Sequence, residues 1–289
     1  MDVELPQYTM TFDDDGGKVS SAIDNPQALN DITQKVLSSL APAPEIGPVP
    51  DTFVQLPAGL VTPGGVVREA EVQELTGEHE EALAKSRANG NPAKFVNTLL
   101  ASGVVRIGED KITPKVLSSL IQGDLDALLL GIRRATFGSE FEVFEIPCPS
   151  CGEANDLKLD LSNIPVKELD DPAVREFDVP LRKGRFARIQ FPTGEVQNEI
   201  FKKQMSVPEM NSITLAECVL GFVEADGSFV PSRGLRDVKG LGIADRRTLQ
   251  DYIYENQPGP RYDQVTAACH ACEGEVPVPL NVGILFREL

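Results

Sequence analysis

The sequence lacks the residues and motifs on which most enzymes depend. Its 289 residues include only two histidines. One of them, His79, lies among glutamates in a predicted helix, where a solvated helix face is the simplest interpretation. No phosphate-binding loop, nucleophile elbow or dinucleotide fingerprint occurs, and the acidic residues are too scattered to indicate an acid–base pair. These absences argue against an enzyme.

Positive charge and long apolar runs are also scarce. The 27 Lys and Arg residues against 44 Asp and Glu give a formal net charge of −17, and the basic residues form only isolated pairs. A chain this acidic is repelled by phosphate backbones, so we do not expect nucleic acid as a partner. No apolar run reaches the length of a membrane span, and the first twenty residues show no signal peptide. We therefore expect no membrane association.

Cysteine is rare but patterned. Two C-x-x-C pairs occur, Cys148-Pro149-Ser150-Cys151 and Cys269-His270-Ala271-Cys272, each between strand-like runs. Two such pairs predict a zinc ribbon in which Cys148, Cys151, Cys269 and Cys272 hold one structural Zn²⁺. Unligated thiols, two disulfides or a thioredoxin-like redox pair are the alternatives. A four-cysteine site has no open coordination position, so it would stabilise the fold and not catalyse a reaction.

Two residues near this pattern are not predicted to bind metal. His270 lies inside the second pair, but four sulfurs already complete a tetrahedron. Cys218 lies in an apolar helical stretch and is expected to be a small buried hydrophobic residue. Free thiols and metal-bound thiolates both suit a reducing compartment.

Residues 1–50 are predicted to form an extended arm. Residues 1–24 are polar and acidic, and residues 41–50 form a stiff Pro-rich spacer. Between them a predicted helix begins at Asn25 and Pro26. Its apolar stripe consists of Leu29, Ile32, Val36 and Leu40. We expect this stripe to dock on another protein chain; the alternative is that it packs on its own chain.

The remaining sequence predicts an α+β protein in which β-hairpins and helix clusters are stapled by the zinc ribbon. We expect one domain over residues 51–139 and a second over 140–289, with a long helical insertion between the cysteine pairs. Within the insertion a helix is predicted over 212–222 and a loop over 224–241, and the C-terminal residues 276–286 are expected to be extended.

The second half of the chain also echoes the first. Residues 177–181 resemble the start of a hairpin predicted over 53–76, and Thr193-Gly194-Glu195 opens a helix as Thr76-Gly77-Glu78 does. A degenerate internal duplication is one explanation of this similarity, and convergent turn chemistry is the other.

One ordered series of short segments is distinctive. Leu56-Pro57, Gly65 and Leu75-Thr76-Gly77-Glu78 are followed by residues 124–138, DLDALLLGIRRATFG, and then by Phe141-Glu142-Val143 and Cys148-Pro149-Ser150-Cys151-Gly152. In this order they resemble the baseplate hub and hub-assembly proteins of T-even-like contractile-tailed phages.

That resemblance implies a zinc-stabilised structural or assembly protein with no enzymatic role. Its expected partners are other phage tail or baseplate hub proteins in a hetero-oligomeric assembly. Its expected location is the host cytoplasm during assembly, and the virion tail if it is retained in the particle. A zinc-ribbon adaptor or regulator, associated with nucleic acid or a transcription complex, is the alternative. The acidic residues around both cysteine pairs oppose that alternative.

Overall fold

The computed structural model describes residues 52–88, 90–200 and 205–289, which belong to one compact unit, Pro50–Leu289. The predicted arm, with its helix and the stripe of Leu29, Ile32, Val36 and Leu40, lies outside the described residues. The arm therefore stays a prediction.

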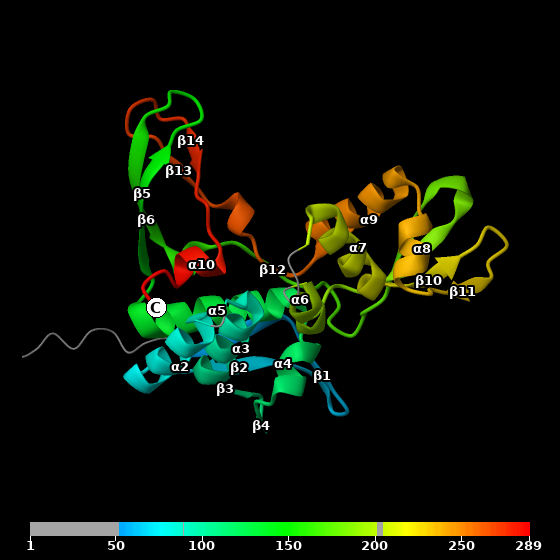
Figure 1. The fold of residues 1–289 in the computed structure, drawn as a ribbon, viewed down its shortest axis with the longest axis horizontal. Helices are drawn as coiled ribbons and strands as arrows, with labels where there is room; N and C mark the ends of the chain where they lie inside the picture. The colour runs from blue at the N-terminus through cyan, green and yellow to red at the C-terminus, as the bar shows by residue number, and fades with distance from the viewer. Residues whose placement is uncertain (1–51, 89, 201–204) are drawn as a thin grey trace, which may run out of the picture. The chain divides into compact units, whose positions relative to one another are not determined.

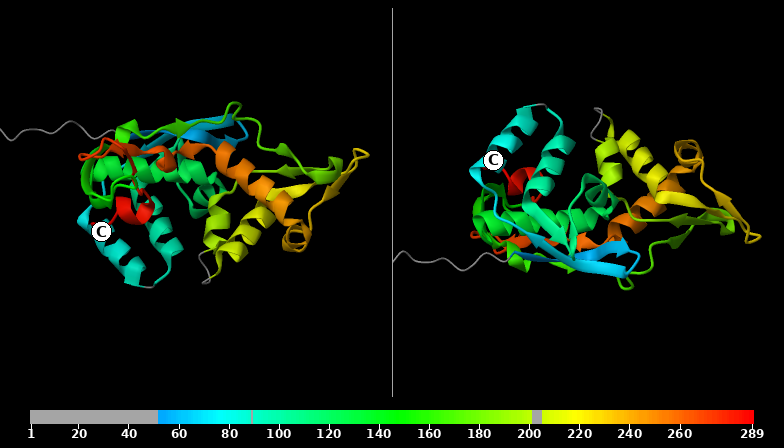
Figure 2. Two further views of the ribbon diagram at one scale, coloured as in Figure 1. Left: turned by 90° about the horizontal axis from the view of Figure 1, so that it is seen from above. Right: turned by 90° about the horizontal axis from the view of Figure 1, so that it is seen from below.

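The chain from Phe53 to Phe137 combines a four-stranded antiparallel sheet with four helices, and we call it the first repeat. Its elements are β1 (Phe53–Thr62), β2 (Gly65–Val72), α2 (Gly77–Ala88), α3 (Pro92–Gly103), β3 (Val104–Ile107), β4 (Asp110–Lys111), α4 (Pro114–Ser119) and α5 (Gln122–Phe137). The strands pair in the order β1-β2-β3-β4, and α5 packs on β1 and β2 (Figure 2). Local chemistry sets the ends of these helices. Asn91 and Thr113 cap α3 and α4 with side-chain oxygens, and Gly138, with φ of 82°, ends α5.

The chain from Phe177 to Asn256 repeats this series, and we call it the second repeat. Its elements are β8 (Phe177–Pro180), β9 (Phe186–Ile189), α6 (Gly194–Ile200), α7 (Val207–Cys218), β10 (Val219–Val223), β11 (Phe229–Pro231), α8 (Leu235–Gly240) and α9 (Ile243–Asn256). Its strands pair as β11-β10-β9-β8, the same sequential order. In both repeats the second helix runs into the third strand without a loop. The shared order of elements agrees with the hypothesis of an internal repeat.

Buried side chains recur at matching positions of the two repeats. The sequence of α4 and α5 can be aligned with that of α8 and α9, and the sequence of β2 with that of β9. Each alignment pairs residues whose side chains are nearly inaccessible to solvent. The pairs are Leu117 and Val238, Leu128 and Leu249, Ile132 and Ile253, Ala70 and Ala187, and Val72 and Ile189. The repeats have therefore kept the positions that fill their cores.

Each repeat is followed by a short hairpin that carries one cysteine pair. The first is β5 (Glu140–Pro147) with β6 (Ala154–Asp160), and the second is β13 (Thr266–Ala268) with β14 (Glu275–Pro277). We call them the cysteine hairpins, and Figure 1 shows them side by side. The remaining elements are β7 (Val166–Lys167), β12 (Gly259–Pro260), α10 (Val282–Leu285) and three 3₁₀ turns, of which Leu161–Asn163 and Tyr262–Gln264 lie outside the repeats and Arg182–Gly184 joins β8 to β9.

The buried hydrophobic side chains form two clusters. The first joins the first repeat to both cysteine hairpins, with Leu128, Phe141, Val276 and Phe286 among its members. The second lies mainly in the second repeat. The predicted domain boundaries, 50/51 and 139/140, stay predictions, although the first cluster contains side chains from both sides of residue 139.

Three secondary-structure expectations need correction. The predicted helix over 212–222 is too long, since α7 ends at Cys218. The apolar run that follows is strand β10, which pairs with β9 and β11. The predicted loop over 224–241 contains β11 and α8, and the C-terminal segment contains α10, which Asn281 caps. Short apolar runs fit a helix and a strand equally well, so periodicity could not decide these cases.

None of the described helices combines the length and the apolar character that a membrane crossing needs.

Candidate metal centre

Each cysteine pair lies in the turn of its hairpin, and the two turns have the same backbone hydrogen bonds. In each turn, the backbone N–H of the first cysteine donates to the carbonyl oxygen of the residue five positions later. The carbonyl oxygen of the same cysteine accepts from the backbone N–H of the residue four positions later. The donor–acceptor pairs are Cys148 N to Glu153 O, Gly152 N to Cys148 O, Cys269 N to Gly274 O and Glu273 N to Cys269 O, at 2.8, 2.8, 2.9 and 2.9 Å. The turns are therefore two copies of one backbone structure.

The hairpins bring the four predicted sulfurs together. Cys148 Sγ lies 3.7 Å from Cys272 Sγ, and Cys151 Sγ lies 3.7 Å from Cys269 Sγ. All four Sγ atoms lie within 4.8 Å of one another. Sulfurs about 2.3 Å from a tetrahedral ion are about 3.8 Å apart, whereas a disulfide needs about 2.0 Å. The cluster is thus compatible with a single bound metal ion, and the cysteines are free thiols and not disulfides.

Burial and hydrogen bonding distinguish the two cysteines of each turn. Cys148 and Cys269 are 2% exposed and pack in the first core, while Cys151 and Cys272 are exposed. The backbone N–H of Cys151 lowers the pKa of the Cys148 thiol, and the N–H of Ala271 lowers the pKa of Cys269 to about 6. At Cys151 the N–H of Glu153 acts the same way, but the neighbouring thiols and burial outweigh it and raise the pKa to about 12. Each turn therefore pairs a cysteine whose thiol pKa is lowered with one whose thiol pKa is raised.

Asn155 is a further residue of the centre that the sequence did not reveal. Its side chain is 1% exposed, and its amide donates to Glu153 O at 2.9 Å and to Ile146 O at 3.3 Å. Its Oδ1 accepts from the backbone N of His270 at 3.0 Å and lies 2.9 Å from His270 Nδ1. Asn155 thus ties the first turn to the second, and His270 contacts it while lying outside the cysteine cluster. No sequence signal marked Asn155, because its partner is far away along the chain.

We expect Asn155→Ala to lower the free energy of unfolding by about 1–3 kcal/mol, because it removes the part-buried hydrogen bonds by which this side chain links the two turns. Urea denaturation of the purified protein measures the change. The exposed Asn163, replaced by alanine, is the matched control. Equal stability of the two variants would show that the amide does not hold the turns together.

The fifth position of each turn gives a second prediction. Gly152 has φ of 78° and Glu273, its counterpart, has φ of 59°, in the left-handed region that favours glycine. Glu273→Gly should therefore raise the free energy of unfolding by about 1 kcal/mol, and Gly152→Ala should lower it by a similar amount. Thermal or urea unfolding measures both. A loss of stability in both variants would mean that the Glu273 side chain contributes more than its backbone strain costs.

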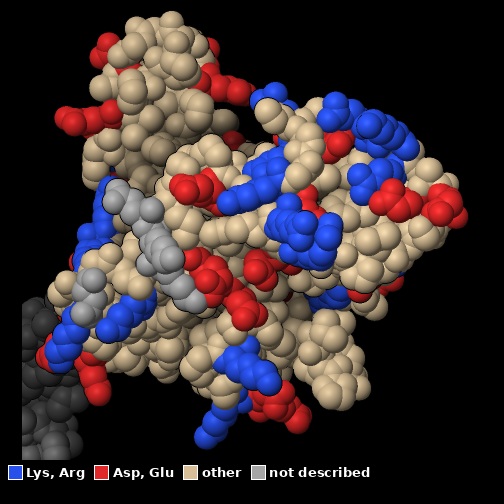
Figure 3. All heavy atoms as spheres, turned by 45° about the vertical axis from the view of Figure 1, so that its right-hand side comes forward, with Lys and Arg blue, Asp and Glu red and all other residues tan. Residues whose placement is uncertain are grey.

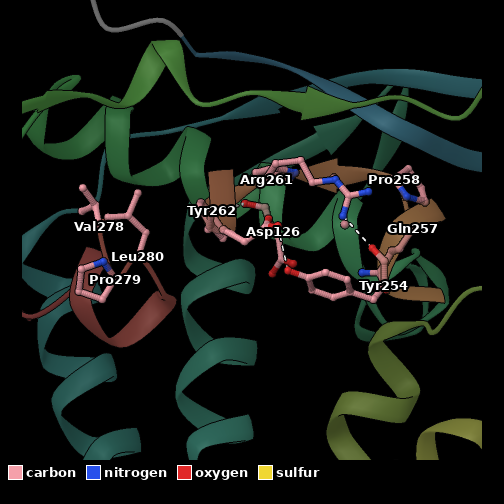
Figure 4. A pocket seen from close by; sticks show the side chains of 13 residues that line it. Asp126, Tyr254, Gln257, Pro258, Arg261, Tyr262, Val278, Pro279 and Leu280 are labelled. Carbon is pink, nitrogen blue, oxygen red and sulfur yellow. Dashed lines mark hydrogen bonds between the residues drawn. The ribbon is translucent and has the colours of Figure 1, made fainter. Parts of the chain in front are cut away.

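Apart from the cysteine cluster, the surface has a pocket of about 420 Å³ between α5 and the segment that follows α9 (Figure 4). Tyr254 Oη donates to Asp263 at 2.8 Å, and Arg261 donates to the Tyr254 carbonyl at 2.8 Å. Gln122 donates to Asp126 at 3.1 Å, while burial raises the pKa of Asp126 to about 6. The pocket lining includes no serine, cysteine or histidine, so it offers none of the usual nucleophile–base pairs.

The raised pKa of Asp126 predicts a pH dependence of stability. Between the ordinary value of 3.8 and about 6, the folded protein binds a proton that the unfolded chain releases. Lowering the pH from about 7 to about 5 should therefore stabilise the wild type by about 1 kcal/mol relative to Asp126→Asn. Urea denaturation of both proteins at both pH values measures the difference. The exposed Asp170, replaced by asparagine, is the control, and parallel curves for the wild type and Asp126→Asn would contradict the assignment.

These features define a class of protein: an α+β scaffold of two repeats, each followed by a hairpin, with four cysteines clustered where the two hairpin turns meet. Residues 62–227 match the family model described as T4 bacteriophage base plate protein. The match spans more than half of the chain, from the end of β1 to the turn before β11, so the chain belongs to this family. The family confirms the resemblance to baseplate proteins and indicates a structural, non-enzymatic role in a phage tail. No curated protein and no solved structure matches the chain.

Proposed function

We propose that this chain is a structural or assembly protein of the phage baseplate hub, stabilised by one Zn²⁺ and acting through protein–protein contacts. Family membership supports the baseplate role. The observation that supports the rest is the four-cysteine cluster, because a four-cysteine site that links the two cysteine hairpins serves to stabilise the fold and leaves no position for a substrate.

Zinc is the ion that fits these ligands best. Four cysteine sulfurs in a tetrahedral arrangement suit zinc or iron, and the separations match a single ion. Cys148, Cys151, Cys269 and Cys272 would hold it as thiolates. The ion would supply a cross-link between the two cysteine hairpins, which lie more than a hundred residues apart in the chain. Ligation of this kind contributes directly to folding free energy.

Metal analysis of the purified protein tests the identity of the ion. We expect about one zinc per chain and no more than traces of iron. Less than about half an equivalent of zinc, together with four titratable thiols and unchanged stability after chelation, would contradict the zinc site.

We further propose that residues 1–50 bind a neighbouring tail protein, with Leu29, Ile32, Val36 and Leu40 as the anchor. An isolated helix of this length is marginally stable in water, and a Pro-rich spacer separates it from residues 52–289. Chain 51–289 should then fold and keep its zinc but fail to join the baseplate. Loss of its cooperative unfolding transition would instead place the stripe in the protein's own core.

A phage that lacks the chain tests the role itself. Its infected cells should accumulate heads without complete tails, and a copy of the gene supplied separately should restore infectivity. Mass spectrometry of purified particles then separates a virion component from a protein that acts in the host cytoplasm and leaves. Normal tails without the chain would refute the baseplate role, and salt-sensitive binding to DNA or RNA would favour the adaptor alternative.

A further inference from the structure

We propose that copies of this chain associate head to tail, with the acidic tip of the cysteine hairpins of one copy against a basic patch on the second repeat of the next. This contact would add a homotypic interaction to the baseplate role proposed above. It concerns the isolated protein, so it can fail while that role stands.

The basic patch lies where the β8–β9 turn meets α8 and α9. Arg182 Nε lies 3.0 Å from Asp245, which joins the turn to the start of α9, and Arg246 donates to the carbonyl of Val238 at 3.3 Å, which joins α9 to α8. The exposed cations of the patch without an ion pair among the described residues are Lys183, Arg236, Lys239 and Arg247. Figure 3 shows Lys and Arg gathered over this part of the surface.

The nearby carboxylates offset only part of this charge. Glu209 attracts Lys239, and Asp237 attracts Arg236, without a close ion pair. Asp237 pairs with Arg233 at 2.8 Å, and Asp245 pairs with Arg182. Both acids are thus matched by other arginines. The patch carries a local excess of positive charge on a chain whose net charge is −17.

The first repeat shows that the fold itself does not require this patch. The positions that match Arg236, Lys239 and Arg247 in the first repeat are Lys115, Ser118 and Asp126. Only one of the three is basic. The second repeat therefore carries cations at two positions where the first repeat has none.

The cysteine hairpins carry the opposite charge. The hairpins, residues 140–160 and 266–277, contain a single lysine or arginine, Lys158, and it pairs with Glu142 at 2.7 Å. Near the tip the exposed carboxylates without an ion pair among the described residues are Glu145, Glu153, Asp156, Glu273 and Glu275. Thiolates of a metal-loaded cluster would add further negative charge. Each surface also offers exposed apolar area that a contact could cover: Ile243 at 87% on the patch, and Phe144 at 53%, beside the Arg287 guanidinium, on the hairpins.

The two surfaces cannot meet within one molecule. Figure 1 shows the cysteine hairpins and α8 on different sides of the described residues. A contact between two different surfaces repeats from copy to copy and produces a ring or a filament. Long-range repulsion between acidic chains is screened beyond about 8–10 Å at physiological salt, so the charges at the contact decide whether it forms.

Sedimentation velocity of the full-length, zinc-loaded protein tests this association. In about 100 mM salt we expect species larger than a monomer, which dissociate in about 500 mM salt. Reversing the patch with Arg236→Glu and Lys239→Glu should weaken association at least about tenfold, and so should reversing the tip with Glu153→Lys and Glu275→Lys. Lys115→Glu, at the first-repeat position that matches Arg236, is the control and should associate as the wild type does.

Mixing the two reversed variants gives the decisive result. Each is predicted to be monomeric alone, and together they should associate because the basic tip of one meets the acidic patch of the other. Zinc content and unfolding midpoint confirm that both remain folded. A monomeric wild type, or a mixture that stays monomeric, would overturn the proposal. The proposal would also be overturned if the protein never self-associated but bound DNA through the patch. The partner of the patch would then be nucleic acid.

Discussion

Cys269→Ser should abolish zinc binding and lower the free energy of unfolding by at least about 4 kcal/mol. Cys269 is 2% exposed and packs in the first core, so its loss removes both a ligand and the anchor of the second cysteine hairpin. Structural zinc contributes roughly 10–16 kcal/mol in small peptides, which exceeds the stability of an ordinary domain. Zinc content and urea denaturation measure the effect, and Cys148→Ser should behave in the same way.

Cys218→Ala is the matched control for that experiment. Cys218 is fully buried in the second core, away from the cluster, and burial raises the pKa of its thiol to about 12. Its replacement should cost about 1 kcal/mol and leave the zinc content unchanged. A chelator should destabilise the wild type and Cys218→Ala but should have little further effect on Cys269→Ser. If chelation instead destabilised Cys269→Ser as strongly as the wild type, the metal would lie elsewhere.

Gly123→Ala should be the second most damaging substitution, lowering the free energy of unfolding by at least about 3 kcal/mol. A Cβ at Gly123 would lie 1.6 Å from the carbonyl oxygen of Pro258, and a Cβ at Gly259 would lie 2.7 Å from Gly123 Cα. The obstacle is backbone, so α5 and β12 would have to move apart. Because β12 leads into the second cysteine hairpin, the substitution should also weaken zinc binding. Urea denaturation and competition with a zinc chelator measure the two effects.

Gly77→Ala controls for the loss of a helical glycine. Gly77 begins α2, and a Cβ there would meet nothing within 4 Å. We expect it to be neutral or slightly stabilising, because alanine loses less entropy on folding. If Gly123→Ala resembled Gly77→Ala, the close crossing of α5 and β12 would not position the second hairpin.

The sequence by itself determined the features that depend on neighbouring residues. Asn91-Pro92 and Thr113-Pro114 marked two helix starts, because a cap satisfies backbone N–H groups within three residues. Two C-x-x-C pairs marked the four clustered cysteines, because two thiols at this spacing fit one turn. The ordered segments around residues 124–138 also sufficed to indicate the baseplate family.

Tertiary structure alone decided the features that depend on distant residues. The two repeats share short sequence matches but one arrangement of elements, because burial constrains positions such as Leu128 and Leu249 while solvent leaves the surface free to diverge. Asn155 and Gly123 have ordinary sequence surroundings. Their importance comes from His270 and Gly259, which only the folded chain brings against them. Local patterns thus specify turns, caps and ligand pairs, but close packing between remote segments depends on the whole fold, and no local pattern encodes it.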